Sequence, residues 1–398
     1  MEVRAGYKLT EVGMIPEDWE VKRIADFASV GSGGTPSRAI AAYWNGSIPW
    51  ITTSQIDFGT IYEAQQFITD EGLQNSAAKL LPAGTLLMAL YGQGKTRGKV
   101  GVLGSPASTN QACASIALDE SVSREFILQY LTSRYEEIRT SSNSGSQENL
   151  SGSIVKGLLV ASPQLPEQRA IAAALDDMDS LLAGLDRLIA KKRDLKQAAM
   201  QQLLTGQTRL PGFQGEWEST TLEAATHCLD GLRVPLNEAE RATMKGDIPY
   251  CGANGVVGFV DRYVIDDDII LMAEDGGYFD EYETRPIAYR MAGKCWVNNH
   301  AHILKAKDGF DQRFIFYSLV HKNILPFLAS GTRAKLNKSE MNKIAVSLPK
   351  DKLEQAAIAA VLSDMDAELT ALETRRDKTC ALKQAMMQEL LTGKTRLV

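Results

Sequence analysis

The 398-residue sequence lacks the features that mark several large classes of protein. No stretch approaches the roughly 20 consecutive apolar residues that a membrane-spanning helix needs. Residues 1–10 carry charges and have no apolar core, so they do not look like a secretory signal. The five cysteines are scattered and include no Cys-x-x-Cys pair, which predicts free thiols in a reducing compartment. Together these absences predict a cytoplasmic protein.

Excess positive charge is also missing. The net charge is −6, which does not by itself indicate a nucleic-acid-binding protein. If the chain binds DNA, its positive surface must be local, or a partner must supply much of it. The length exceeds one ordinary core, and the hydrophobic fraction of 44% is ordinary for a globular protein, so two domains of common size are expected.

Motifs for nucleotide or cofactor chemistry are incomplete or missing. The glycine-rich stretch from Tyr91 to Lys99 resembles a phosphate-binding P-loop, but Ala89 stands where its first glycine is required. The Gly393-Lys394 pair fails in the same way. We find no glycine fingerprint placed between a strand and a helix, and no Asn-Pro-Pro-aromatic motif of amino-methyltransferases. No catalytic residue is therefore assigned.

Two clusters suggest metals only weakly. His300 and His302 with Cys295 could bind zinc, but no fourth ligand follows at a usual spacing, so hydrogen-bonded histidines at a strand end are favoured. The Glu274-Asp275 pair could belong to a metal-dependent nuclease, but no lysine follows at a nuclease-like spacing, so a solvated acidic turn is favoured. We expect neither a metal nor a cofactor to bind this chain.

The sequence contains one clear internal repeat. Residues 167–210 align without a gap on residues 354–397, and 26 of these 44 positions are identical. Apolar residues in each copy follow one another at alternating spacings of four and three: Ile171, Leu175, Met178, Leu182 and Leu185, then Ile358, Leu362, Met365, Leu369 and Leu372. This pattern predicts two long helices with a heptad seam. The seam is lost near Lys192 and Arg376, so we expect the copies to pack on each other over only part of their length.

Identical positions outside the seam suggest a second use for the repeat. Lys196-Gln197 and Thr208-Arg209 recur in the second copy and are expected to be exposed. A shared partner surface would explain why they recur, whereas packing alone would not. The alternative, that both copies are ordinary core helices of duplicated domains, remains open.

The segments before the two helices differ from each other, although both open with a proline and a tryptophan. They are rich in turns and short β-like runs, as in Thr85–Leu90. The first helix runs directly into Trp217, whereas the second stops at the equivalent point. We therefore expect Trp19 to lie against the end of the second helix, with the chain ends close together.

Several turns carry residue types that suit DNA contacts. Glycines let backbone amides approach phosphates, arginine binds guanine, asparagine and glutamine suit adenine, and serine and threonine suit either. A solvated hairpin tip explains the glycine-rich loop equally well, and plain turn chemistry is favoured for each of the other turns taken alone. The candidate DNA contacts are Ser32, Gly33, Thr35, Ser37, Arg38, Thr52, Thr53, Tyr91, Gln93, Lys95, Arg97 and Lys99 in the first segment, and Arg233, Asn254, Asn299, His300, Arg333 and Lys335 in the second.

The whole chain resembles the specificity subunit of a type I restriction–modification system. The repeated pattern carries the resemblance: Pro166-Glu167-Gln168-x-x-Ile171-Ala172 and its second copy each lead to Leu-Leu-Thr-Gly-x-Thr-Arg-Leu. The stretches Ile15–Trp19, Gly33–Ser37 and Asn298–His300 are similar to recognition-domain motifs of this family.

The resemblance implies an α+β fold with pseudo-twofold symmetry. Residues 1–163 and 211–349 would be two mixed α/β target-recognition domains, each binding one half of a split double-stranded DNA target. Residues 164–210 and 350–398 would be spacer helices that pair as a partial antiparallel coiled coil. These helices would dock two modification subunits, which carry S-adenosylmethionine and methylate adenine. Two restriction subunits that use ATP and magnesium can join this core.

Two other functions are compatible with a duplicated architecture. One is a standalone DNA methyltransferase or nuclease, against which the missing motifs count. The other is a scaffold that never touches DNA. The sequence contains only residue types, so it does not identify the bases that would be bound.

Overall fold

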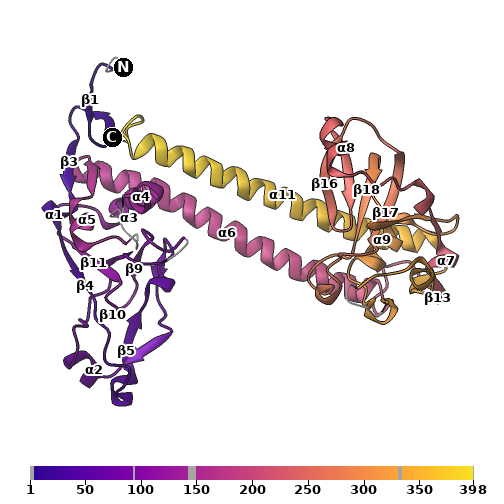
Figure 1. Ribbon diagram of the computed structural model, residues 1–398, viewed down its shortest axis with the longest axis horizontal. Coiled ribbons are helices and arrows are strands. Elements are labelled where there is room, and N and C mark those ends of the chain that lie inside the picture. The colour runs from indigo at the N-terminus through magenta and orange to yellow at the C-terminus, as the bar shows by residue number, and fades with distance from the viewer. Residues whose placement is uncertain (1–3, 93–94, 142–148, 330–333, 398) are drawn as a thin grey trace. The chain divides into compact units, whose positions relative to one another are not determined.

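A computed structural model describes residues 4–92, 95–141, 149–329 and 334–397 (Figure 1). The chain divides into two compact units, Met1–Asp186 with Arg375–Val398, and Arg187–Thr374. Two helices of 39 residues, α6 (Leu165–Leu203) and α11 (Lys352–Leu390), each contribute to both units, because the division falls in their middle. No helix in the described part of the chain has both the length and the apolar character of a membrane span.

The first unit is built on short sheets. Its five-stranded sheet has the order β4 (Ala28–Ser32), β11 (Cys113–Leu118), β8 (Leu86–Ala89), β9 (Val100–Leu103) and β6 (Thr60–Ile61). A three-stranded sheet has the order β10 (Ser108–Thr109), β5 (Trp44–Ile51) and β7 (Gln66–Ile68). Two further pairs join β1 (Tyr7–Thr10) to β2 (Gly13–Pro16), and β3 (Glu20–Arg23) to β12 (Leu159–Ser162). The helices are α1 (Ile24–Phe27), α2 (Asp70–Gln74), α3 (Arg124–Ser133), α4 (Tyr135–Thr140) and α5 (Gly152–Gly157).

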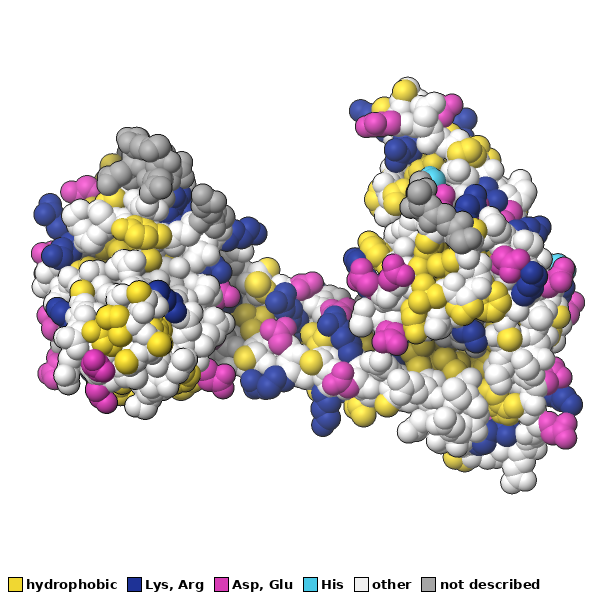
Figure 2. Space-filling view, turned by 60° about the horizontal axis from the view of Figure 1, so that its bottom comes forward, with side chains coloured by type: hydrophobic (Ala, Val, Ile, Leu, Met, Phe, Trp, Pro, Cys, Tyr) yellow, Lys and Arg dark blue, Asp and Glu magenta, His cyan; other side chains and the backbone are white. Residues whose placement is uncertain are grey.

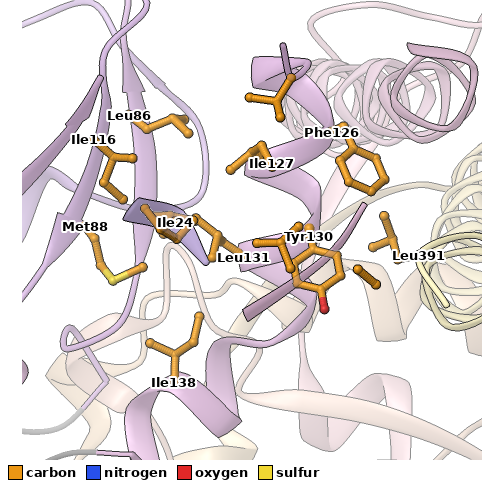
Figure 3. Close-up of a cluster of buried hydrophobic side chains, with 14 of the residues drawn as sticks. Ile24, Leu86, Met88, Ile116, Phe126, Ile127, Tyr130, Leu131, Ile138 and Leu391 are labelled. Carbon is orange, nitrogen blue, oxygen red and sulfur yellow. The ribbon is translucent and has the colours of Figure 1, made fainter. Parts of the chain in front are cut away.

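Apolar runs explain where the core of this unit lies. Every residue of β8 and β9 is buried, as expected for strands covered on both faces. Helix α3 is capped by Ser123, whose hydroxyl accepts a hydrogen bond from the Phe126 amide. Figure 3 shows α3 side chains facing the sheet residues Leu86 and Met88.

The second unit contains one larger sheet. Its six strands have the order β14 (Thr226–Cys228), β19 (Ala301–Ala306), β17 (Ile265–Ala273), β18 (Ala288–Val297), β15 (Ile248–Gly252) and β16 (Gly255–Val260). A separate pair joins β13 (Trp217–Thr221) to β20 (Ala345–Pro349). The helices are α7 (Leu222–Ala225), α8 (Glu238–Thr243), α9 (Gln312–Val320) and α10 (Lys338–Asn342).

Both units use the same frame around different sheets. In each, an antiparallel strand pair closes the unit, β3 with β12 in one and β13 with β20 in the other, and its first strand leads into a four-residue helix. The second strand of each pair leads into a long repeated helix. These observations confirm the predicted α+β fold, with one frame repeated in the two units.

Helices α6 and α11 run antiparallel, and charged pairs join them. In the first unit Asp179 bonds Lys383 at 2.6 Å, and in the second unit the equivalent residues Asp366 and Lys196 bond each other. Near the predicted loss of the seam, Lys192 pairs with Glu368 at 2.7 Å. Figure 2 shows cationic and anionic side chains interspersed along these helices. Ion pairs thus take the place of apolar contacts where the seam is lost.

This pairing corrects one sequence expectation. Lys196 and Arg209 were expected to be exposed, but both are half-buried and bonded within the chain, which gives a reason for their recurrence other than a partner surface. The Arg209 guanidinium forms a bidentate ion pair with Glu354, which is 1% exposed. In the first unit Arg396 makes the equivalent pair with Glu167. The neighbouring Gln197 is exposed, as expected.

The Glu-Gln motif that opens each repeat ties its helix to the rest of the unit. The Gln168 side chain accepts a hydrogen bond from the Ser123 amide at 2.8 Å, where α3 begins. The Gln355 side chain accepts one from the Asp311 amide at 2.8 Å, where α9 begins. Both glutamines are buried, so in each unit the motif fixes the short helix against the long one.

The ends of the two long helices meet equivalent tryptophans. A Cβ atom at Gly393 would lie 3.1 Å from the Trp19 ring, and one at Gly206 would lie 3.0 Å from the Trp217 ring. Both glycines have positive φ, 69° and 71°, which suits a residue without a side chain at a helix end. The Tyr7 hydroxyl also donates to the Gly393 carbonyl at 2.9 Å. The predicted contact of Trp19 with the end of the second helix is confirmed.

Candidate nucleic-acid interface

In the second unit, four predicted DNA contacts surround one short loop. This loop, residues 274–276, follows β17 and is called the acidic turn below. Arg233 and Lys335 bond the two carboxylate oxygens of Glu274, the second at 2.8 Å. The His300 ring lies 2.5 Å from the Asp275 carboxylate. Asn254 donates to the Gly276 carbonyl at 2.8 Å, so the structure brings these residues together.

Backbone hydrogen bonds hold the acidic turn in place. The Glu274 amide donates to the His300 carbonyl at 2.9 Å, and the Leu336 amide donates to the Glu274 carbonyl at 2.7 Å. Asn299 is exposed, and its backbone carbonyl accepts a hydrogen bond from the Arg233 guanidinium at 3.5 Å. The turn is therefore a rigid platform at one end of the sheet.

Glu274 itself is buried, with 8% of its surface exposed. The expected solvated acidic turn is thus wrong for this residue. Burial alone would raise the pKa of the Glu274 carboxyl, but hydrogen bonds from Lys335 and Arg233 lower it overall. Glu274 remains a carboxylate that holds two cations in fixed positions.

Replacing Glu274 should therefore destabilise the second unit. Glu274→Gln keeps the shape but leaves Arg233 and Lys335 without their counter-charge, at an expected cost of about 2–4 kcal/mol. Asp267→Asn is the matched control, because Asp267 pairs with Lys305 at 2.5 Å on the surface and should contribute less than about 1 kcal/mol. Urea unfolding of the purified variants measures both changes. Equal losses in the two variants would show that burial of Glu274 does not matter.

A buried histidine supports the platform from below. His302 is 1% exposed, its Nδ1 lies 2.7 Å from an Asp230 oxygen, and its Nε2 lies 2.8 Å from the Leu336 carbonyl. Both partners are acceptors, so the doubly protonated ring satisfies both. Burial would lower the pKa of His302, but the bonds to Asp230, Cys228 and Leu336 raise it to about 9.

These contacts also correct the zinc interpretation. Cys295 lies beside Cys251 in the sheet, not beside the histidines. Among the described residues, the sulfur of Cys228 lies within 4.8 Å of ligand atoms of Asp230 and His302, a spacing that could hold a metal ion. Both ring nitrogens of His302 are already bonded, however, and Arg233 lies 3.3 Å from Asp230. Hydrogen bonds and charge pairing therefore account for the positions of Asp230 and His302 in this cluster.

His302 should make the stability of the second unit depend on pH. Its pKa is raised from 6.5 to about 9 on folding, so its contribution is fully present below about pH 6.5 and is lost as the pH rises through about 9. The loss between about pH 6 and about pH 10 should be about 3 kcal/mol. Urea unfolding at both pH values, compared with His302→Gln, isolates this contribution. A variant whose stability falls as much as that of the wild type over this range would exclude His302 as the cause.

In the first unit, the predicted residues lie in two neighbouring groups. Gly33 packs so closely on Thr109 that a Cβ atom would lie 2.1 Å from its carbonyl oxygen, so this glycine is needed for packing. Thr35 bonds Gln111 through their side chains. The Arg38 guanidinium stacks 3.6 Å from the centre of the Trp44 ring, and its Nη2 donates to Gln66 at 2.7 Å. Arg38 is thus held as a flat, oriented donor.

The remaining turn residues of this group bond one another. Trp44 donates from its ring nitrogen to the Ser37 carbonyl at 3.1 Å. The Thr52 and Ser54 hydroxyls are 2.8 Å apart, where a short 3₁₀ turn, Thr53–Gln55, begins. These contacts are those of ordinary turns, which the sequence had left open as an alternative.

The glycine-rich loop forms the second group. Lys99 pairs with Asp57 at 2.7 Å and lies 5.6 Å from the Phe58 ring, so its charge is largely used within the chain. The Lys95 carbonyl accepts a hydrogen bond from Tyr135 at 2.5 Å, and the Lys95 side chain is exposed. Two of the predicted residues, Gln93 in this loop and Arg333 in the second unit, lie outside the described residues.

A cavity of about 730 Å³ adjoins this loop. Ser32 and Tyr91 line it, as do Gln111, Ser151 and Lys156. The structure thus brings two predicted residues from distant positions into one polar cavity. Its size and polar lining could take a nucleotide or a set of ordered waters.

The comparisons with known proteins agree with this architecture. The family model described as the type I restriction modification DNA specificity domain matches twice, over residues 16–191 and 216–379. The chain belongs to this family. As a specificity subunit it is a non-catalytic component, which excludes the standalone enzyme.

Individual relatives and solved structures resemble this chain to different extents. A type I restriction enzyme specificity subunit of Haemophilus influenzae is 34% identical over 140 residues, which are 35% of this chain and 34% of that protein. The chain therefore matches only about a third of that relative's length. The MjaX specificity subunit of Methanocaldococcus jannaschii is 23% identical over 98% of this chain and 97% of its own. The crystal structure of the type I S subunit from M. genitalium has a TM-score of 0.66 at 18% identity, covering 96% of this chain and 97% of that chain, so the fold is shared.

Sequence reasoning missed three features of the specificity subunit's candidate interface. Glu274 was set aside as solvated. The apolar strand before it, however, predicts that the first residue of the acidic turn is buried. Gln111 is not among the predicted residues, because its bond to Thr35 joins two positions that no local pattern connects. Lys156 gave no signal, because it belongs to a short helix that only the fold places beside Tyr91.

Proposed function

We propose that this specificity subunit binds double-stranded DNA and recognises a bipartite target. Residues 1–163 would recognise one half of the target and residues 211–349 the other. The observation that carries this proposal is the shared frame of the two units around different sheets and loops. A repeated frame with unlike loops supplies two different recognition surfaces in one chain.

The helices would join the two recognition surfaces and dock two modification subunits. Those subunits would carry S-adenosylmethionine and methylate adenine in each half of the target. Restriction subunits using ATP and magnesium would complete the complex. No cofactor is assigned to the specificity subunit itself.

Charge placement supports recognition of bases rather than broad attraction to phosphates. Arg233 and Lys335 are balanced by Glu274, and Lys99 is balanced by Asp57. The chain as a whole carries a net charge of −6. Partner subunits would therefore supply much of the charge that neutralises phosphates, while the oriented side chains select base edges.

Methylation mapping tests the proposal directly. The specificity subunit is combined with the modification subunits of the same system and with genomic DNA, and modified adenines are located by sequencing. We expect one split target, and no modification when the specificity subunit is omitted. Modification that does not require this chain, or a target without an unread gap, would contradict the proposal.

Removing the cations of the glycine-rich loop should weaken recognition of one half-target. In Lys95→Ala/Arg97→Ala/Lys99→Ala, we expect the assembled complex to lose about 1–3 kcal/mol of DNA-binding free energy and to accept more than one base at one position. Fluorescence anisotropy and methylation mapping measure the two effects. Lys79→Ala, an exposed lysine elsewhere in the same unit, is the control. An unchanged methylated sequence in the triple variant would mean that the loop is only a hairpin tip.

A further inference from the structure

The cavity beside the glycine-rich loop is assembled from separate parts of the first unit. Its polar lining includes residues that are distant in sequence: Ser32 at the end of β4, Tyr91 after β8, Gln111 after β10 and Lys156 on α5. The volume of about 730 Å³ falls within the range of sites that bind small molecules. The fold therefore builds a site-sized cavity here from four elements.

Several hydrogen-bond donors of this lining have no acceptor in the described part of the chain. The Gln111 side-chain oxygen accepts from Thr35, but its amide nitrogen donates to no described residue. The Ser32 hydroxyl and the Lys156 ammonium also bond no described group. None of the residues that line the cavity is acidic. A ligand that fits must therefore bring acceptors and negative charge, as a phosphate and the carbonyl groups of a base do.

Tyr91 adds a flat aromatic surface to the cavity. Its exposed fraction is 43%, and its ring contacts no other ring and no cation among the residues that the structure describes. Leu90 and Leu150 lie beside it in the lining, and the Leu150 amide donates to the Leu90 carbonyl at 3.0 Å. An aromatic ring at the wall of a cavity can stack on any nucleobase, because every base has a π-face.

The α5 side of the cavity suits a phosphate group. Lys156 supplies a positive charge there and is exposed. The hydroxyls of Ser151 and Ser153 lie 2.8 Å apart, so one of them donates to the other and the second proton is left to bond a ligand. Ammonium and hydroxyl groups are common partners of phosphate oxygens in protein–DNA complexes.

We propose that this cavity binds one unpaired nucleotide, with its base stacked on Tyr91 and its phosphate beside Lys156. A paired base within a duplex does not fit, because its two faces are covered by its neighbours in the stack. The nucleotide has two sources, a free mononucleotide or one nucleotide of the target strands. The second source rests on the proposed function, since a methyltransferase that extrudes its adenine from the duplex leaves the opposite nucleotide unpaired.

Photocrosslinking tests the site and distinguishes the two sources. Iodouracil replaces thymine in the probes, because on irradiation it forms a covalent adduct with an aromatic side chain that it stacks on. In the first arm the full-length chain is irradiated with iodo-dUMP. In the second arm the complex with the modification subunits is irradiated on a duplex that carries its mapped target, with each thymine replaced in turn. Mass spectrometry locates the adduct, which we expect on Tyr91 in at least one arm.

Three variants show whether the adduct reports the proposed binding mode. Lys156→Gln should lower the adduct yield roughly tenfold at subsaturating probe, because a charge-assisted bond to the phosphate is lost. Lys79→Gln is the matched control, since Lys79 is an exposed lysine of the same unit outside the lining, and should leave the yield unchanged. Tyr91→Phe keeps the ring and should keep the adduct. Circular dichroism confirms that each variant is folded.

The outcomes decide both the site and its source. An adduct on Tyr91 with iodo-dUMP makes a free nucleotide the ligand, and an adduct on the duplex alone makes it a nucleotide of the target. No adduct on Tyr91 in either arm overturns the inference, as does a yield that Lys156→Gln leaves unchanged. Inorganic phosphate that competes as well as dTMP also overturns it, because the base would then not be bound. Methylation of the same duplex is measured in parallel. If the complex methylates no duplex, the proposed function fails and the first arm alone decides the site.

Discussion

Exchanging residues 1–163 for the same segment of a relative should change one half of the methylated target and leave the other half unaltered. The expected effect is large, because discrimination of each base pair is worth about 1–3 kcal/mol and several pairs change together. The physical reason is that the polar groups of each unit are bonded within that unit. The acidic turn of the second unit, for example, bonds Arg233, Lys335 and Asn254, all of which the exchange leaves in place.

Methylation mapping of the hybrid complex measures this exchange. The reciprocal exchange of residues 211–349 is the matched control and should change only the other half. The junction after residue 163 is suitable because Pro163 lies between β12 and α6, outside both elements. The Gln168 side chain donates to the Pro163 carbonyl at 2.9 Å, a bond that any residue at position 163 can accept. If a single exchange altered both halves, the two units would not be independent, and the bipartite proposal would fail.

The frame of the molecule could be predicted from the sequence because it is repeated. A helix reveals itself by a spacing of three and four residues, and two copies at one shift reveal a symmetry. The sequence also located the place where the seam fails, near Lys192 and Arg376. It could not show what replaces the seam, because Lys192 bonds Glu368, a residue 176 positions away.

The repeated polar residues show why a pattern can be found and its reason missed. Lys196 and Arg209 bond Asp366 and Glu354 inside the chain, and these bonds give their recurrence a reason that the sequence did not show. Both partners lie in the other helix copy, so each bond appears twice by symmetry. A sequence identifies which residues recur, but only the fold shows whether a charge faces solvent or another charge.

The candidate site was predictable in its residue types and not in its geometry. Arg233, Asn254, His300 and Lys335 are distant in sequence, and each alone resembles an ordinary turn residue. They meet because β17 ends beside the start of β19, which places the acidic turn among them. Glu274 holds Arg233 and Lys335 in place, although the sequence alone suggested that it was solvated. The missing information was burial, which depends on contacts that no local window contains.

Matched insertion of four residues in both repeated helices should lengthen the unread gap between the two half-targets. The insertions are placed within residues 187–191 of α6 and the equivalent 374–378 of α11, where the two units divide. Four helical residues add about 6 Å along each helix, which corresponds to roughly two base pairs of duplex. The bases recognised in each half should stay the same, because no insertion touches either recognition surface. Methylation mapping reports both quantities.

Both helices must be lengthened together, because charged pairs fix their register. Asp179 with Lys383 and Lys196 with Asp366 lie on either side of the insertion points. An insertion in α6 alone would shift one of these pairs by about 6 Å relative to its partner, so we expect that variant to unfold more easily or to lose methylation. The single insertion is therefore the control for the matched one. If the matched variant is folded and methylates DNA with an unchanged gap, helix length does not set the length of the unread gap. The partner subunits must then determine that length.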